Sequence, residues 1–462
     1  MFIPTTKPLF PWESLTDPTD LHVIKQFFDL LPDHKLLASL RRFRGRGRND
    51  HPVHVQWRTA LLTPFLRHQH TDSTLQELRR NPSLWPIVGI MTEGDIPTKY
   101  SMSRFMETLG TQPHLKHLQD IFNVMIRRLA DAVASLGVNC AGDATALRAR
   151  RDGGGANPDG LPQPDGGHKE YTDDDGNVTK IIEWFGYKAH LLVDAKHEVI
   201  VAYLITKAST ADNTVIPALV KQGMENLPNV AAGAKKSQPP HRIKTLAYDK
   251  AGDDLKVHQF LDANRIKPVI KNRTSWKTEQ ERMLPGHDGT SNIVYDEAGA
   301  VYCYDMTTDP PVRHRMAYIG HEPERRTIKY RCPAMHGGWK CPSHDRCNNG
   351  LKYGKTVRVK QDIDLRRFTS IPRQTKEFQR LYKGRTSVER ANARLKIYWG
   401  ADDGNVTGPA RFFAFFGLVM VVHAGTATLL AAAPRNDGKF GKMHLSHVSK
   451  ELRRKIKEQN AA

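Results

Sequence analysis

The sequence predicts an α/β protein with a mixed β-sheet and flanking helices at its centre. Before residue 132, apolar residues recur at helical spacing, as in Ile24, Phe27, Phe28 and Leu31. Between residues 138 and 270, strand-like runs are followed by alternating helical and strand-like patterns, and short extended runs amid many charges begin near residue 272. We therefore expect an α-helical N-terminal domain, an α/β domain and a β-rich insertion that interrupts it.

The charge balance favours a polyanionic partner. Lys and Arg total 69 against 49 acidic residues, a net charge of +20, and nucleic acid is the leading candidate for such a partner. Five cysteines are too few for a disulfide framework and the first residues lack a signal-peptide pattern, so we expect a cytoplasmic protein. The apolar stretch 412–433 is long enough to test as a membrane span, but we expect a buried core helix and no membrane contact.

Residues 1–132 are predicted to form a helical region that binds DNA. Within it Arg41, Arg42 and Arg44 surround Phe43 and precede Gly45. We expect a flexible basic segment suited to DNA phosphates, with a solvated loop as the alternative.

Residues 133–271 are predicted to form the first part of the α/β domain. The expected strands are 138–144, 180–194, 198–207, 244–248 and 266–270, and the expected helices are 213–226 and 253–264. Three strands followed by helix, strand, helix and strand is the order of an RNase H-like sheet. The stretch 152–177 is rich in Gly, Pro and Asp and is predicted to be a mobile surface loop.

Residues 272–373 are predicted to be the β-rich insertion, and they contain a group of cysteines. Cys332, Cys341 and Cys347 lie close in sequence, and Cys303, His336 or His344 could supply a fourth ligand. Thiolates and imidazoles at tetrahedral sites favour structural Zn²⁺, and the alternative is a set of free thiols. Residues 374–434 are predicted to return to the core as catalytic helices, followed by a basic tail, 435–462.

One helical segment is predicted to present a carboxylate between cations and a phenol. Tyr382, Arg385, Glu389 and Lys396 fall within an arc of roughly 60° at about 100° per residue. Such a face suits a phosphodiester, with Glu389 on a metal and the cations on phosphate oxygens. The alternative is a salt-bridged surface helix, since Arg385 and Glu389 are also an i, i+4 pair.

These four residues have the spacing of the signature that closes the active site of many DDE transposases of bacterial insertion sequences. Two further segments resemble that family, Cys140 to Thr145 around Asp143 and Leu246 to Gly252 around Asp249. The sequence departs from the pattern at Gly252, where an aromatic residue is common. The resemblance implies that Asp143, Asp249 and Glu389 are catalytic and hold Mg²⁺ or Mn²⁺. It also implies that Tyr382, Arg385 and Lys396 contact DNA, and that a homodimer acts on the DNA.

A physical argument accompanies the resemblance. Asp143 and Asp249 end strand-like runs, whose ends can converge on one crevice of an α/β sheet, and a helix packed on the sheet can bring Glu389 to them. Three gathered carboxylates require cations, and two metal ions about 3.5 to 4 Å apart support in-line displacement at phosphorus. We therefore expect a transposase that cuts terminal inverted repeats of double-stranded DNA and joins 3′ hydroxyls to target DNA. The alternatives are a structure-directed endonuclease on the same fold and a catalytically silent DNA-binding regulator derived from a transposase.

Overall fold

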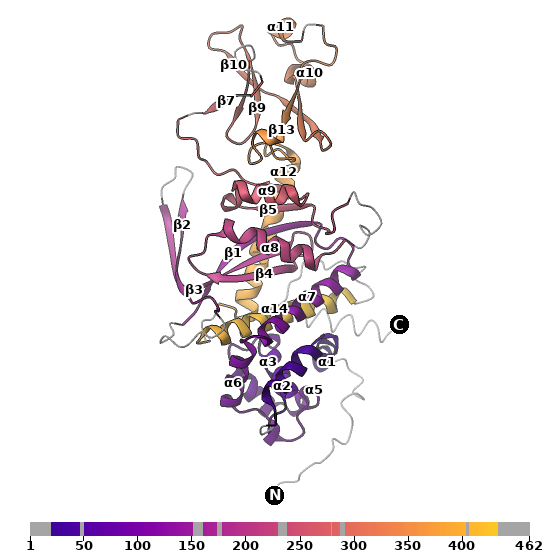
Figure 1. Cartoon of the computed structure of the whole chain (residues 1–462), viewed down its shortest axis with the longest axis vertical. Coiled ribbons are helices and arrows are strands. Elements are labelled where there is room, and N and C mark those ends of the chain that lie inside the picture. Colours follow the sequence, from indigo (N-terminus) through magenta and orange to yellow (C-terminus); the bar gives the residue numbers. More distant parts are fainter. Residues whose placement is uncertain are drawn as a thin grey trace.

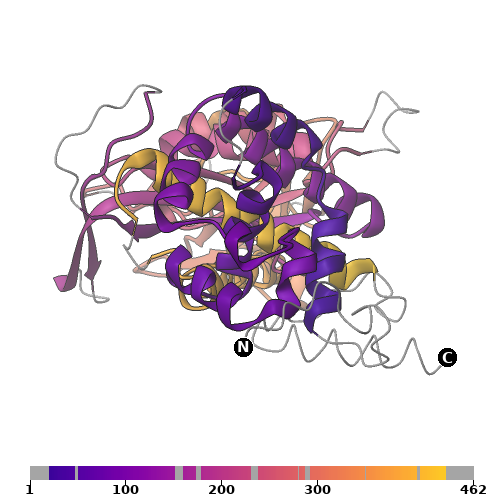
Figure 2. The ribbon, with the colours of Figure 1, turned by 90° about the horizontal axis from the view of Figure 1, so that it is seen from below.

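The N-terminal part of the protein is a group of helices at the lower end of the molecule (Figures 1 and 2). The computed structural model describes residues 20–432 except 47–49, 151–159, 173–177, 230–237, 279, 287–291, 349 and 403–405, so the predicted tail 435–462 lies outside the described residues. The helices are α1 (Asp20–Leu30), α2 (His34–Arg44), α3 (Val53–Phe65), α4 (Thr71–Arg80), α5 (Trp85–Val88), α6 (Lys99–Leu109) and α7 (His114–Ala132). This agrees with the helical pattern expected before residue 132.

The centre of the molecule is a mixed sheet, as the sequence predicted, with six strands in place of the five expected. Its strands are β1 (Asn139–Arg148), β2 (Asp165–Thr172), β3 (Val178–Asp194), β4 (Ile200–Lys207), β5 (Thr245–Tyr248) and β6 (Lys267–Ile270). The order is β2-β3-β1-β5-β6, and β4 also pairs with β3. The pairs of β3 with β1, β2 and β4 are antiparallel, whereas β1, β5 and β6 run parallel. Helix α8 (Asp212–Asn226) packs on β3 and β4, and α9 (Leu255–Ala263) packs on α8 and β6.

Strand β2 corrects the expectation of a loop over 152–177. Residues 165–172 pair in antiparallel register with β3, and Gly167 lies opposite Trp184. A Cβ atom on Gly167 would come within 2.5 Å of the Trp184 ring, so this glycine allows a close contact between strands. At Gly167, a glycine that suggested a loop in the sequence instead serves the packing of two strands.

The described residues of the returning C-terminal segment are mostly helical, but the helix type changes. It comprises α12 (Lys376–Tyr382), a 3₁₀ turn at Lys383–Arg385, α13 (Thr386–Ala393), a π-helical turn at Arg394–Tyr398 and the long helix α14 (Pro409–Ala432). The single continuous helix expected from Tyr382 to Lys396 is therefore interrupted at both ends of α13. These changes alter the direction of the side chains that follow them.

Helix α14 is the apolar stretch whose composition resembles a membrane span. Residues Pro409–Leu429 are long and apolar enough to cross a membrane, yet 94% of the window is buried inside the protein. The helix packs along α7, α6, α3 and α1 (Figure 1). A Cβ atom on Gly417 would lie 2.4 Å from Leu118 of α7, so glycine permits the close crossing of these helices. A single hydrophobic core consequently runs from the N-terminal helices through α14 to the sheet.

The insertion lies at the opposite end of the molecule from the N-terminal helices (Figure 1). One sheet has the order β10-β9-β8-β7 and the other the order β11-β12-β13. The elements are β7 (Glu281–Met283), β8 (Ile293–Asp296), β9 (Val301–Asp305), β10 (Val312–Arg315), β11 (Ala317–Glu322), β12 (Thr327–Arg331), α10 (Pro333–Gly337), α11 (His344–Asn348) and β13 (Thr356–Lys360). The insertion has a separate hydrophobic core.

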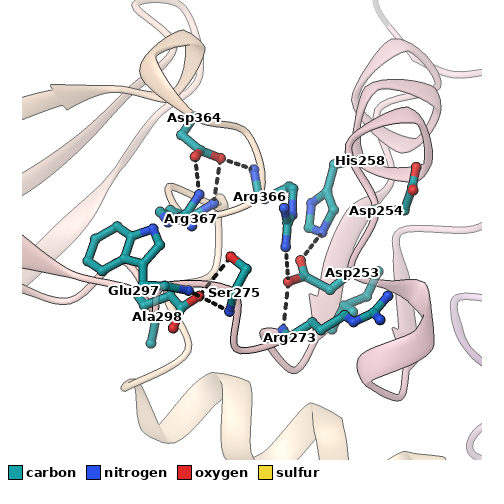
Figure 3. A network of polar contacts seen from close by, with 12 residues as sticks. Asp253, Asp254, His258, Arg273, Ser275, Glu297, Ala298, Asp364, Arg366 and Arg367 are labelled. Carbon is teal, nitrogen blue, oxygen red and sulfur yellow. Dashed lines mark hydrogen bonds and ion pairs between the residues drawn. The ribbon is translucent and has the colours of Figure 1, made fainter. Parts of the chain in front are cut away.

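A buried polar network connects the insertion to the sheet (Figure 3). Asp253, just before α9, contacts His258 at 3.1 Å, Arg366 at 2.9 Å and Arg373 at 3.3 Å, and it accepts a bond from the backbone N–H of Arg273 at 2.7 Å. Burial alone would raise the pKa of Asp253, but these contacts hold it well below its usual range. The carboxylate therefore joins two separate parts of the chain.

Candidate active site

Asp143 and Asp249 belong to neighbouring parallel strands of the sheet. Strand β1 pairs with β5 through residues 139–141, and Asp143 lies on β1 just beyond this paired part. Asp249 follows β5 directly, where its side chain accepts a bond from the N–H of Ala251 at 2.9 Å. Parallel strands bring their carboxyl ends to the same edge of a sheet, so the two aspartates lie at the same edge.

The ring of Tyr248 fills the space between these two segments. A Cβ atom on Gly142 would come within 2.5 Å of this ring, and one on Gly252 would lie 3.1 Å from the Cβ of Tyr248. Tyr248 is only 1% exposed. Gly252, the departure from the family pattern, therefore makes room for a large neighbour. A side chain there would press on the residue that precedes Asp249.

Glu389 is carried to the sheet by α13, which packs on β1 and β3. Ser387, Val388 and Ala391 form its buried face. Arg390 contacts Glu198, in the turn between β3 and β4, at 2.6 Å, and Arg394 also pairs with Glu198. Glu389 itself is half-exposed, and its position depends on these anchors on the other side of the helix.

Arg385 connects the first aspartate with the glutamate. One terminal nitrogen lies 3.6 Å from Asp143 and the other donates to Glu389 at 2.6 Å. Burial opposes ionisation of Arg385, but Asp143, Tyr382 and Glu389 outweigh it and raise its pKa. The guanidinium is therefore held as a cation between two carboxylates that are distant in the sequence.

The electrostatics of Asp143 are those of a crowded acidic site. Burial and the negative charge of Asp249 together raise the pKa of its carboxyl to about 6. Lys169 of β2 and Arg385 act in the opposite direction. Asp249 therefore lies near enough to Asp143 for the two negative charges to repel each other, and an added cation would favour ionisation of Asp143.

These carboxylates fit a hard divalent cation by their chemistry. Their donors are oxygen atoms only, the set that Mg²⁺ and Mn²⁺ prefer. As the side chains lie, no group of three or more His, Cys, Asp or Glu residues within the described part of the chain is arranged to hold a metal ion. Arg385 supplies the positive charge between Asp143 and Glu389 instead. A metal at this edge would compete with that guanidinium.

A model of the transposase DDE domain matches residues 140–424, more than half of the chain. The chain belongs to the transposase DDE domain family. No curated protein matches it. Membership of this family makes the protein a DDE transposase by descent and implies DNA as its partner and a divalent metal as its cofactor. The matched region contains β1, β5 and α13, the elements that carry Asp143, Asp249 and Glu389.

Two further residues of the predicted signature have separate environments in this DDE domain. Tyr382 stacks on Phe378 at 5.8 Å between ring centroids, with the ammonium of Lys271 4.9 Å from its own ring. Burial and the nearby carboxylates Asp249 and Asp143 raise the pKa of its phenol, although Arg385 opposes this. Lys396 follows the π-helical change and forms an ion pair of 3.2 Å with Asp402.

Asp402 also accepts a bond of 2.6 Å from the backbone N–H of Arg148. Lys396 is thus held near the C-terminal end of β1, beyond Asp143, and does not contact the carboxylates directly. The change of helix type before Lys396 explains why equal angular spacing on an ideal helix did not predict this position.

Several residues beside the DDE carboxylates were not singled out from the sequence. Lys169 lies on β2, and its charge lowers the pKa of Asp143. Lys188 of β3 forms an ion pair of 3.0 Å with Asp212, at the start of α8. Lys169 was not singled out because the stretch that contains it, 152–177, was predicted to be a surface loop.

The basic N-terminal residues of this transposase lie at the end of α2, which corrects the expected flexible segment. Arg41, Arg42 and Arg44 occupy its last turn. Arg41 and Arg42 are exposed. Arg44 donates to the carbonyl oxygen of His51 at 2.7 Å and also bonds Gln56, so it contributes to packing.

Proposed function

We propose that the protein cuts DNA at the terminal inverted repeats of an insertion sequence and joins the freed 3′ hydroxyls to target DNA. The observation that carries the proposal is the position of Arg385, which contacts both Asp143 and Glu389. Because Asp249 raises the pKa of Asp143, the third carboxylate lies within electrostatic reach of this pair. These pairwise relations support one shared site for the three acidic groups, which are distant in the sequence.

The topology supports an RNase H-like core. Strands β1, β3 and β4 are antiparallel neighbours, and β5 and β6 then continue the sheet in parallel with β1. Helices α8 and α9 follow β4 and β5 in the chain. With the hairpin strand β2 added, this is the element order from which we inferred an RNase H-like domain.

The residues of the site divide the chemistry among them. Asp143, Asp249 and Glu389 would hold Mg²⁺ or Mn²⁺. Bound divalent ions would activate the attacking water or 3′ hydroxyl and stabilise the leaving oxygen. Arg385 would then transfer its bonds from the carboxylates to non-bridging phosphate oxygens, where a planar guanidinium binds well. Tyr382, whose ring stacks on Phe378, would pack against a sugar or base.

DNA further from the reacting phosphodiester would be held by basic residues. Arg41 and Arg42 project from α2 for phosphate contacts, and Arg44 orders that helix end. Lys396 can reach a phosphate once its ion pair with Asp402 opens. Paired ends require two active sites, so a homodimer assembled on DNA in the bacterial cytoplasm completes the proposal.

The test is a joining reaction with paired inverted repeats taken from the DNA that flanks the gene, a target plasmid and Mg²⁺. The unaltered protein should yield cleaved ends and joined products. Asp143→Asn, Asp249→Asn and Glu389→Gln should each reduce cleavage by on the order of 100-fold or more, since each removes a charged ligand from the reacting centre. Gel-shift binding of the repeats without metal should stay within about twofold.

Glu225→Gln, an exposed substitution on α8, is the matched control and should retain both cleavage and joining. Cleavage that survives in one of the three variants removes that residue from the site. Cleavage without joining by the unaltered protein would favour a structure-directed endonuclease, and binding without cleavage a DNA-binding regulator. Either result contradicts the proposal.

A further inference from the structure

Four of the five cysteines meet at the outer end of the insertion, away from the carboxylates. Cys303 lies on β9, Cys332 precedes α10, Cys341 follows α10 and Cys347 lies on α11. All four line one cavity of about 30 Å³. A cavity of this size has room for only one or two atoms of the size of a water molecule.

The thiols are close enough to influence one another. Burial, together with the neighbouring Cys332, Cys341 and Cys347, raises the pKa of Cys303 to about 12. Negative charge on several of these sulfurs is therefore unfavourable unless a cation lies among them. Zinc reverses this preference, because it binds thiolates and displaces their protons.

The chain around these cysteines has little else to stabilise its fold. Between β12 and β13, Ala334 is the only buried hydrophobic residue among those the structure describes. Helices α10 and α11 have five residues each, too few to be stable without tertiary contacts. The other buried residues in the described part of this segment are Ser343, Asn348 and Gly354. A short segment without an apolar core commonly depends on a metal or a disulfide.

Existing contacts already bring the segment to the strands. The backbone N–H of Cys332 donates to Lys355 at 2.8 Å, and Ser343 donates to Asp305, at the end of β9, at 2.6 Å. The sulfurs take only long contacts, with the Cys303 thiol 3.7 Å from the His314 carbonyl oxygen and the Cys332 sulfur 3.9 Å from the Asn348 amide nitrogen. The four sulfurs are not at metal-ligand distances from one common point. Among the described residues, no group of three or more His, Cys, Asp or Glu side chains is arranged to hold a metal ion. Rotation of the thiols toward the shared cavity is the movement that binding requires.

We propose that Cys303, Cys332, Cys341 and Cys347 bind one structural Zn²⁺ that fastens the segment between β12 and β13 to β9. The site is independent of the catalytic carboxylates, and its role is to order the end of the insertion. All four cysteines are free, so no disulfide competes for these sulfurs in the structure. His314 and His344 also line the cavity, which makes them the rival imidazole ligands to exclude.

The experiment measures zinc in the full-length protein by elemental analysis after purification without chelator. One zinc ion per chain is expected. Cys303→Ser, Cys332→Ser, Cys341→Ser and Cys347→Ser should each lose most of it. Cys140→Ser is the matched control, because Cys140 is buried in β1 and should not affect zinc content. His314→Ala and His344→Ala should also retain zinc. Loss of zinc in either variant, with retention in Cys303→Ser, would overturn the four-cysteine assignment.

A second measurement does not depend on whether the variants fold. The unaltered protein, loaded with Co²⁺ in place of zinc, should give the absorption bands of a tetrahedral cobalt site with sulfur ligands. Chelation should then increase protease cleavage between β12 and β13 while the N-terminal helices stay resistant. An unaltered protein that takes up neither metal, or whose cysteines are found as disulfides by mass spectrometry, rules out the zinc site.

Discussion

Arg385 acts as an internal cation among the acidic residues. Its guanidinium contacts Asp143 and Glu389 and is only a quarter exposed. A divalent ion at this edge therefore meets a positive charge as well as its ligands. Arg385→Gln should raise the affinity for Mn²⁺ by roughly tenfold, since a single charge at this range changes the interaction by about 1 to 2 kcal/mol. The same change should lower DNA cleavage, because the phosphate loses its guanidinium partner.

Calorimetric titration of Mn²⁺ at pH 8 provides the measurement. Lys383→Gln removes the same charge from an exposed neighbouring position and should leave the Mn²⁺ affinity within about twofold. A fall in Mn²⁺ affinity in Arg385→Gln would mean that the arginine organises the carboxylates for the metal and does not compete with it.

At this scale the sequence predicted where the acidic residues lie but not what they contact. The spacing of Tyr382, Arg385 and Glu389 placed them in one helical segment, and the strand-like runs placed Asp143 and Asp249 near strand ends. The bond between Arg385 and Asp143 joins residues from opposite ends of the domain, and no local pattern encodes it. Lys169 was missed for the same reason.

At the scale of elements, α14 is fixed to the sheet by a buried histidine. The Nε2 atom of His423 accepts a bond of 2.9 Å from the N–H of Ile200. Burial lowers the pKa of His423 to about 3. The unfolded chain binds this proton below about pH 6.5, whereas the folded chain does not until about pH 3. The stabilisation is therefore complete above pH 6.5 and is lost as the pH falls toward 3.

His423→Gln removes this titration and keeps an acceptor near Ile200. Between pH 7 and pH 5 its free energy of unfolding should fall by about 2 kcal/mol less than that of the unaltered protein, at about 1.4 kcal/mol per pH unit. Urea unfolding at several pH values measures the difference. The exposed His70→Gln should follow the unaltered protein, and parallel curves for His423→Gln would contradict the assignment.

Helices and strands were predicted well where the pattern of apolar and polar residues was uniform along the element. They were predicted poorly where a close contact with another segment determined the local structure. The expected strands 180–194 and 244–248 differ from β3 and β5 by two residues or fewer at each end. β2 was missed because its glycines resemble those of a loop in the sequence. In the structure, Gly167 leaves room for the Trp184 ring on the neighbouring strand. The segment from Tyr382 to Lys396 looked continuous, but Gly384 approaches Ala195 closely and the chain tightens there into a 3₁₀ turn.

At the scale of the whole molecule, the insertion and the sheet have separate hydrophobic cores joined through Asp253. This carboxylate is almost fully buried and neutralises Arg366 and Arg373 (Figure 3). Asp253→Asn should lower the free energy of unfolding by about 3 kcal/mol or more, because it leaves buried cations without a counter-charge. Urea unfolding provides the measurement.

Asp362→Asn is the matched control for a charge lost from an exposed ion pair. Asp362 pairs with Arg326 at 2.7 Å, and its side chain is 63% exposed. The expected loss of stability is within about 1 kcal/mol. Equal losses in the two variants would show that the Asp253 network adds no more than a surface contact.

The order of the domains could be predicted from changes between helical and strand-like residue patterns along the sequence. The contacts between the domains could not. The sequence suggested a separate N-terminal region, whereas its apolar residues merge with those of the sheet through α14. The polar network around Asp253 unites residues from the two flanks of the insertion, and each looked like an ordinary charged residue in the sequence.

Because α14 packs on both the N-terminal helices and the sheet, these two parts share one hydrophobic core. The N-terminal helices therefore cannot rotate as a rigid body relative to the sheet without disrupting that core. A DNA duplex gripped at α2 would be held in a fixed orientation to the strand edge that carries Asp143. Any bending needed to bring a scissile phosphate into reach then falls on the duplex, whose deformation energy depends on its base sequence. The preference for particular end sequences would in that case arise partly from DNA stiffness.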